Sequence, residues 1–220
     1  TTLAITLARN GVPTTLLCRG RAEAQVLQRD RQNKRFLDGV PFPPSLAVTA
    51  NWEEIIGDSK VILFAVPSRT LRVNAQAVAR VMTGSAVILS ATKGLDPETG
   101  QRMTAILEEE IGSGYIEALA AISGPNLAKE IADGKPATAV IASGKAVIAE
   151  ELSNLFRSSV FRAYVSSDII GVELAGAMKN VIALGAGVCD GLDYGVNAKA
   201  AFINRGLVEL IRLGVPLGAE

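Results

Sequence analysis

The sequence predicts an α/β protein with a doubly wound, mostly parallel sheet, followed by the start of an all-helical domain. Short runs rich in Val, Ile, Leu and Ala recur along the first three quarters of the chain, with helical patterns between them. These runs are nearly continuous rather than alternating, which is typical of parallel strands buried on both faces. From Ser167 onward the pattern is helical throughout. We therefore expect two domains, 1–165 and 166–220.

The elements follow one another at short spacing. An apolar helical stretch at the start of the chain ends at the Asn10-Gly11 pair. Strands are expected at 13–18, 45–50, 60–67, 85–93, 118–125 and 137–144. Helices are expected at 21–31, 69–82, 99–112, 126–133 and 146–156. Alternation of this kind predicts right-handed crossovers, which place ligands at the carboxyl ends of the strands.

Small residues mark the first helix of the predicted second domain. They stand at Gly171, Ala175, Gly176, Ala183, Gly185 and Gly187. Because small residues let helices approach closely, we expect this helix to be buried and tightly packed.

Composition excludes several classes of protein. Lys and Arg number 22 against 22 Asp and Glu, and 49% of residues are hydrophobic, which argues against a nucleic-acid binder or a disordered chain. We expect no apolar run long enough to span a bilayer, no signal peptide and no metal site, and hence a cytoplasmic protein. Cys18 and Cys189 are expected to be buried thiols, with a disulfide as the alternative.

Candidate site residues stand at the predicted strand ends. One strand ends in Thr92-Lys93-Gly94, and another ends in Ser123-Gly124-Pro125-Asn126 just before a helix. A lysine and a Gly-Pro-Asn turn beside a helix N-terminus favour a small anionic ligand, although such residues also serve simply to make turns.

Lys179 is the most informative single residue. It lies in the apolar stretch AGAMKNV, where a charged side chain must reach solvent, pair or take part in chemistry. The chain has no histidine, so a lysine whose pKa is lowered by burial or by a second cation is a candidate general base. The alternative is a surface lysine whose stem lies along an apolar face.

Arg19 follows the first predicted strand in the stretch CRGR, with no acid before Glu23. In a dinucleotide-binding fold this position faces the adenosine ribose, where an acid selects NAD and an arginine accepts the 2′-phosphate of NADP. The stretch therefore favours NADP, with a solvated loop arginine as the alternative.

Taken in order, the motifs SATKGL, ISGPNLAKE, GVELAGAMKNVIALGAGVCDGL and NRGLVELIRLG resemble the bacterial type of NAD(P)-dependent glycerol-3-phosphate dehydrogenase. The resemblance covers the chain from end to end. It implies a Rossmann-like nucleotide domain and reversible hydride transfer between NAD or NADP and sn-glycerol 3-phosphate, giving dihydroxyacetone phosphate and supplying phospholipid synthesis. No nucleic-acid or membrane partner is expected, and a homodimer is possible.

The resemblance also implies roles for individual residues. Lys179 matches the proton acceptor, and Lys93 matches the lysine that touches both substrate and cofactor. Gly124 and Asn126 match substrate contacts, although many relatives have Ser or Thr where Asn126 stands. Two further positions match cofactor contacts: Ala128 and Arg19.

The family carries a Gly-x-Gly-x-x-Gly loop before the helix that TTLAITLARNG matches, and its later helices supply an Asp, a Ser or Thr and an Arg-Asn pair for the substrate phosphate. We therefore expect an internal fragment whose sheet lacks its first strand. Such a fragment, by itself, is expected to bind NADPH very weakly and to be inactive.

Two alternatives are open. Enzymes such as 6-phosphogluconate dehydrogenase also place a lysine on the first helix after the nucleotide domain, with Asn four residues later. Here that position is Ala183, and Asn180 lies about 100° round the helix. The other alternative is a non-catalytic dinucleotide-sensing module, against which the retention of both lysines argues.

Overall fold

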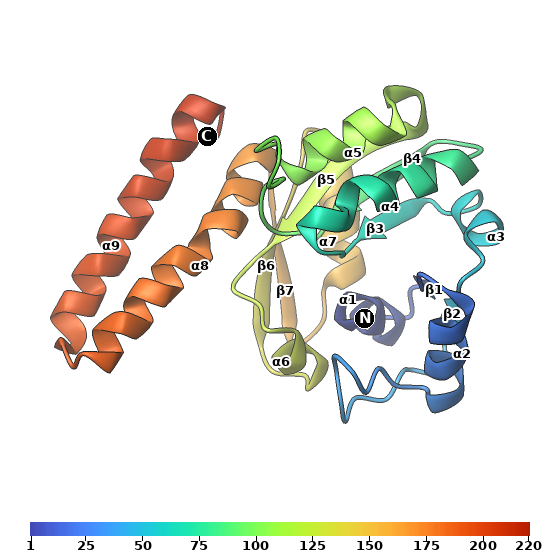
Figure 1. Ribbon diagram of the computed structural model, residues 1–220, viewed down its shortest axis with the longest axis horizontal. Helices are drawn as coiled ribbons and strands as arrows, with labels where there is room; N and C mark the ends of the chain where they lie inside the picture. The colour runs from blue at the N-terminus through green and yellow to red at the C-terminus, as the bar shows by residue number, and fades with distance from the viewer.

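The computed structural model describes residues 1–220, as a sheet flanked by helices from which two long helices extend to one side (Figure 1). The strands are β1 (Thr14–Leu17), β2 (Leu46–Thr49), β3 (Val61–Phe64), β4 (Ala86–Ser90), β5 (Ile116–Ser123), β6 (Ala137–Ser143) and β7 (Phe161–Ser166). The helices are α1 (Thr2–Arg9), α2 (Arg21–Asp30), α3 (Trp52–Ile56), α4 (Ser68–Val81), α5 (Met103–Ile111), α6 (Ala128–Ala132), α7 (Ala146–Phe156), α8 (Ile169–Gly191) and α9 (Gly195–Gly214). Two short 3₁₀ turns complete the list, at Ser113–Tyr115 and Val215–Leu217.

The strands form two hydrogen-bonded sheets. β1 pairs with β2 in parallel, and a five-stranded sheet has the order β3-β4-β5-β6-β7. β4 is buried along its whole length and pairs in parallel with β3 and β5, which is why its sequence is apolar without alternation. The expected α/β fold class is confirmed, and parallel crossovers through α4 and α5 bring the carboxyl ends of β3, β4 and β5 to one edge.

One pairing differs from the expected parallel arrangement. β6 runs antiparallel to β5, with Ala120 opposite Ser143 and Ser123 opposite Val140. The connection between them, residues 124–136, contains only the short helix α6, and this helix packs beside α1 instead of crossing a face of the sheet. The chain therefore turns back on itself, and parallel pairing resumes between β6 and β7.

Three apolar cores hold the layers together. One lies between α4, α5 and the sheet around Leu71, Ile88 and Ile106, all fully buried. The second lies on the opposite face, where α7 packs Leu152 and Phe156 on β5, β6 and β7. The third joins α1 and α2 to the loop before β2. Apolar burial of this kind is the main source of stability.

Two elements escape sequence reasoning. α3 has only five residues, too few to show a helical period. β7 alternates between buried and exposed residues over Phe161–Tyr164, but the alternation is hard to see in the sequence because Tyr164 and Val165 are exposed as well as Arg162. Two predicted helices are also too long, since 99–112 is helical only over Met103–Ile111 and 126–133 only over Ala128–Ala132.

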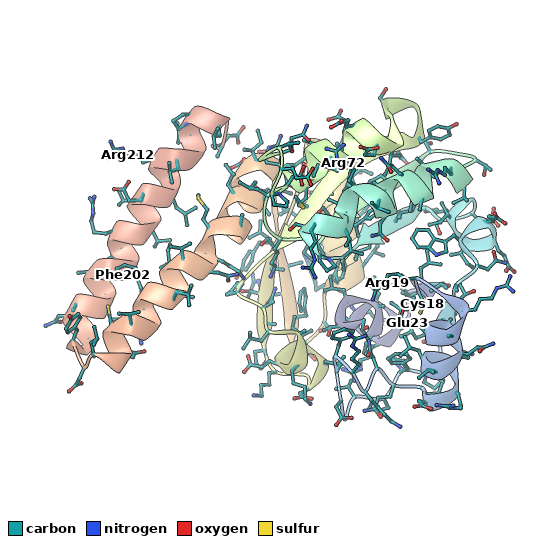
Figure 2. All side chains as sticks on the ribbon, viewed as in Figure 1. Cys18, Arg19, Glu23, Arg72, Phe202 and Arg212 are labelled. Atoms are coloured by element: carbon teal, nitrogen blue, oxygen red, sulfur yellow. The ribbon has the colours of Figure 1, made fainter.

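The expectation of a buried α8 is wrong for the second half of the helix. Its buried residues are Glu173, Leu174, Gly176 and Cys189, whereas the apolar side chains of Val181, Leu184 and Val188 are exposed. Some of the small residues allow close contacts with different partners. A Cβ on Gly176 would lie 2.5 Å from Ser123 Oγ of β5, and a Cβ on Gly185 would lie 2.0 Å from the ring of Phe202, which points from α9 toward α8 (Figure 2).

The expectation that no apolar run could span a bilayer is also wrong for α8. With 23 residues and a mean hydropathy of 1.5 in its most apolar window, α8 is long and apolar enough to cross a membrane. Glu173 and Lys179 interrupt the run in the sequence, yet the Ile, Val and Leu residues around them keep the mean hydropathy high. One such helix is weak evidence for a membrane span, because core helices pass the same test.

Candidate functional site

The site lies where β4 and β5 end side by side. β4 ends at Ser90, which pairs with Ala121 of β5, and Lys93 follows three residues later. β5 ends at Ser123, and Gly124 is the next residue. Because the two strands are parallel, Lys93 and Gly124 meet at one edge, as the sequence predicts.

α8 brings the second lysine to the same edge. The helix begins at the N-cap Asp168, whose carboxylate accepts a hydrogen bond from the Gly171 N–H (2.7 Å). Two turns on, α8 approaches the end of β5 so closely that a Cβ on Gly176 would lie 2.5 Å from Ser123 Oγ. This close approach places Lys179, one turn later, over the strand end.

Both lysines donate to one acceptor. Lys93 Nζ donates to the carbonyl oxygen of Gly124 (3.3 Å), and Lys179 Nζ makes a short hydrogen bond to the same oxygen. Neither ammonium forms an ion pair with a carboxylate, so two positive charges share a single neutral partner. Such a site favours an anionic ligand that supplies the missing charge.

Desolvation and the neighbouring Lys179 ammonium lower the pKa of Lys93 to about 8, although part of its side chain is exposed. The charged form is disfavoured in a partly dry site and next to a like charge. Below pH 8 the amine of Lys93 is therefore mostly protonated and attracts anions, and above that pH this attraction is lost.

The Gly124–Asn126 turn is tightly packed. The backbone N–H of Asn126 donates to the Gly124 oxygen (2.9 Å). A Cβ on Gly124 would lie 2.5 Å from Thr138 O and 2.8 Å from Asn126 Nδ2, so only glycine fits. Asn126 Oδ1 is buried without a hydrogen-bond partner, so this turn holds one unpaired acceptor.

The other two predicted contacts lie apart from this cluster. Arg19 is exposed just beyond the carboxyl end of β1, close to Cys18 and Glu23 (Figure 2). Ala128 is the first residue of α6, and its carbonyl accepts a hydrogen bond from Thr2 Oγ1 of α1 (3.3 Å). No hydrogen bond links either residue to the lysines.

Glu173 is a site neighbour that sequence reasoning missed. Its side chain is only 4% exposed and forms an ion pair with Arg102 (2.7 Å). The sequence contained a signal for it, since Glu173 is a carboxylate in an apolar helix, six residues before Lys179, and a buried carboxylate must find a partner. The same argument that singled out Lys179 applies to it.

The cysteines and the acidic residues form no second candidate site. Cys18 and Cys189 are both buried free thiols, as expected, and burial raises the pKa of Cys18 to about 11. No group of three or more His, Cys, Asp or Glu side chains is placed to hold a metal ion. A cavity of about 740 Å³ lies along β7, and neither Lys93 nor Lys179 lines it.

Comparison with known proteins settles the family. The family described as "NAD-dependent glycerol-3-phosphate dehydrogenase N-terminus" matches residues 1–149, and its C-terminal counterpart matches residues 168–220. The chain belongs to the NAD-dependent glycerol-3-phosphate dehydrogenase family.

Members of this glycerol-3-phosphate dehydrogenase family match the chain over its whole length. "Glycerol-3-phosphate dehydrogenase [NAD(P)+]" of Chlorobium limicola is 40% identical over 220 residues, which are all of this chain and 66% of the relative. The protein of the same name from Dehalococcoides mccartyi is 43% identical, with 61% of its length covered. The chain thus spans just under two thirds of these curated relatives.

Solved structures of the glycerol-3-phosphate dehydrogenase family agree. The crystal structure of glycerol-3-phosphate dehydrogenase from Coxiella burnetii is similar with a TM-score of 0.88 at 32% identity, covering all of this chain and 66% of that one. The enzyme from Saccharomyces cerevisiae has a TM-score of 0.83 at 28% identity, over 97% of this chain and 66% of that one. The predicted Rossmann-like fold followed by a helical part is confirmed.

Proposed function

We propose that the protein is an NAD(P)-dependent dehydrogenase that interconverts sn-glycerol 3-phosphate and dihydroxyacetone phosphate. The observation that carries this proposal is the convergence of Lys93 and Lys179 on the Gly124 carbonyl without a carboxylate. A small phosphorylated alcohol supplies the negative charge that this pair lacks, and it offers a hydroxyl on which a lysine can act as a base.

Lys179 is the proposed proton acceptor. NAD or NADP, when bound, would supply the hydride-transfer chemistry. As the substrate alcohol is oxidised, its hydroxyl proton passes to the Lys179 amine, and in the reverse direction the Lys179 ammonium returns it to the developing alkoxide. The chain has no histidine that could do this instead.

Three further residues bind the substrate in this proposal. The Lys93 ammonium attracts the anionic substrate and lies between it and the cofactor. The unpaired Asn126 Oδ1 accepts a hydrogen bond from a substrate hydroxyl. Gly124 holds the carbonyl that orients both ammonium groups toward the substrate.

The cofactor is proposed to lie along the carboxyl edge of the strands. α1 begins without an acidic residue in its first turn and without a side-chain cap, so its first N–H groups suit the pyrophosphate. Ala128 borders this helix end through the Thr2 hydrogen bond. Arg19 stands at the end of β1, where it faces the ribose and favours NADP over NAD.

At the level of the whole protein, we propose a nucleotide domain at 1–165 and a helical domain from 166. The end of β7 at Ser166 and the start of α8 at Ile169 support this boundary. We further propose a cytoplasmic homodimer that supplies glycerol 3-phosphate for phospholipid synthesis.

The activity is tested by supplying the full-length gene product with dihydroxyacetone phosphate and NADPH. We expect NADPH oxidation with one sn-glycerol 3-phosphate formed per NADPH. Dihydroxyacetone without the phosphate is expected to react far more slowly, because it cannot balance the two lysine charges. NADP-dependent oxidation of 6-phosphogluconate in place of this reaction would contradict the proposal.

Replacing Arg19 by Ala is expected to weaken NADPH binding by about tenfold or more and to leave NADH binding unchanged. The expected loss is that of one or two charge-assisted hydrogen bonds to the 2′-phosphate. Fluorescence titration measures both affinities. Arg21→Ala, which removes another exposed arginine at the start of α2, is the matched control. Equal losses for NADH and NADPH would refute this role for Arg19.

A further inference from the structure

We infer that Glu173 is a positioning residue that fixes the two site lysines relative to each other, through its contacts with Arg102 and Thr104. Glu173 does not reach the lysines' shared acceptor. Its effect on the proposed reaction rests on the proposed function, whereas the positioning itself depends only on the contacts described here.

All of the hydrogen bonds accepted by the Glu173 carboxylate come from two residues at the start of α5, Arg102 and Thr104. Oε1 accepts from the backbone N–H of Thr104 (2.8 Å), and Oε2 accepts from Thr104 Oγ1 (2.6 Å) and from Arg102 Nη1 (2.7 Å). Arg102 Nη1 also donates to Thr104 Oγ1 (3.0 Å), so the three side chains form a closed network. The carboxylate is nearly fully buried, and breaking such a network leaves buried groups unpaired.

The network caps one helix with a side chain from another. Thr104 lies in the first turn of α5, and Arg102, the N-cap residue of α5, makes no side-chain cap of its own. The carboxylate of Glu173 therefore takes the place of a capping residue, at the helix end where negative charge is favourable. This ties α8 to α5, which packs on β4 and β5.

The same contact reaches the loop that carries Lys93. Arg102 pairs with Leu95 in an isolated antiparallel β-bridge, two residues after Lys93. Within this loop, the backbone N–H of Asp96 donates to Gln101 O (2.9 Å). Lys93 is thus joined to Arg102 by a short, closed loop, and Arg102 is joined to Glu173.

On α8, Glu173 and Lys179 are rigidly related. Six residues of helix separate them by about 9 Å along the axis and set their directions about 120° apart. One carboxylate therefore fixes both sides of the lysine pair: the Lys179 side through the helix, and the Lys93 side through Arg102 and its loop. Because it is fully engaged by Arg102 and Thr104, it also leaves the lysine charges unbalanced for an anionic ligand.

Lysine reactivity tests this inference without an activity assay. Acylation of each lysine is followed by mass spectrometry as a function of pH, since only the neutral amine reacts. In the wild type, the Lys93 midpoint is expected near pH 8 because the amine is partly desolvated and Lys179 is close. In Glu173→Ala the lysines separate, and we expect the Lys93 midpoint to rise by about one unit, which slows its acylation at pH 8 about fivefold.

The direction of the change separates positioning from simple electrostatics. Loss of a nearby negative charge, with the lysines unmoved, would lower the midpoint and speed acylation. A merely structural role would lower the melting temperature and leave the midpoint unchanged. Either result overturns the inference. Asp190→Ala removes an exposed carboxylate from the other end of the same helix and is expected to change nothing at Lys93.

Thr104→Val provides a second variant with no change of charge. It removes the hydroxyl that donates to Glu173 and retains most of the volume of the side chain. We expect the Lys93 midpoint to rise in the same direction by a smaller amount, and an unchanged midpoint would overturn the inference even if Glu173→Ala does not fold. Failure of the proposed function would appear separately, as absence of dihydroxyacetone phosphate reduction with the wild-type lysine midpoints intact.

Discussion

Replacing Lys179 by Ala is expected to lower kcat for dihydroxyacetone phosphate reduction by about 10³-fold and to leave the Kd for NADPH unchanged. Removal of a positioned general acid–base group typically costs 10²- to 10⁴-fold in rate. The nucleotide affinity is retained because Lys179 contacts the Gly124 turn and not the β1 end that carries Arg19. Steady-state kinetics and fluorescence titration measure the two quantities in the full-length gene product.

Two companion variants show which property of Lys179 matters. Lys179→Arg keeps the positive charge but does not release its proton, so we expect substrate binding to survive and turnover to be lost. Lys199→Ala removes a partly exposed lysine of α9 that pairs with Asp190, and it should behave like the wild type. If Lys179→Ala turns over normally, the mechanism is wrong, and a dinucleotide-sensing module becomes the better interpretation.

Replacing Gly124 by Ala is expected to lower kcat/KM by about 100-fold. The new Cβ would lie 2.5 Å from the Thr138 carbonyl, so the backbone itself must move and carry with it the oxygen that both lysines share. A displacement of about 1 Å at a reacting centre costs a factor of this size.

The matched control for this variant is Gly144→Ala. Gly144 follows β6 and has open space where a Cβ would stand, so the substitution should leave kcat/KM unchanged. Equal activity of Gly124→Ala and the wild type would show that the position of the Gly124 carbonyl does not matter for the reaction.

The sequence allowed the fold class to be predicted, and it placed Lys93 and Gly124 at neighbouring strand ends, because both inferences depend on local patterns. Apolar runs such as that of β4 report burial directly, and Lys93 and Gly124 lie immediately after such runs. Lys179 was visible because a charge in an apolar helix is conspicuous. The convergence of Lys93 and Gly124 follows from the rule that neighbouring parallel strands end at the same edge of the sheet.

The features that sequence reasoning missed depend on tertiary contacts. The antiparallel pairing of β6 depends on where α6 packs, and no residue of β6 encodes its direction. The partners of Glu173 could not be identified from the sequence, because Thr104 and Arg102 lie 69 and 71 residues away from it in the chain and only the packing of α5 brings them to it. The exposed half of α8 likewise reflects which elements lie beside it.

Protection of the lysines by substrate tests the central claim most directly, that Lys93 and Lys179 form one site for a phosphorylated substrate. The full-length gene product is acylated at pH 8, with and without dihydroxyacetone phosphate and NADPH, and each lysine is quantified by mass spectrometry. We predict that the ligands slow the acylation of Lys93 and Lys179 together and leave the acylation of Lys129 and Lys199, which lie outside the site, unchanged. Equal acylation of Lys93 and Lys179 in the presence and absence of the ligands would contradict this account.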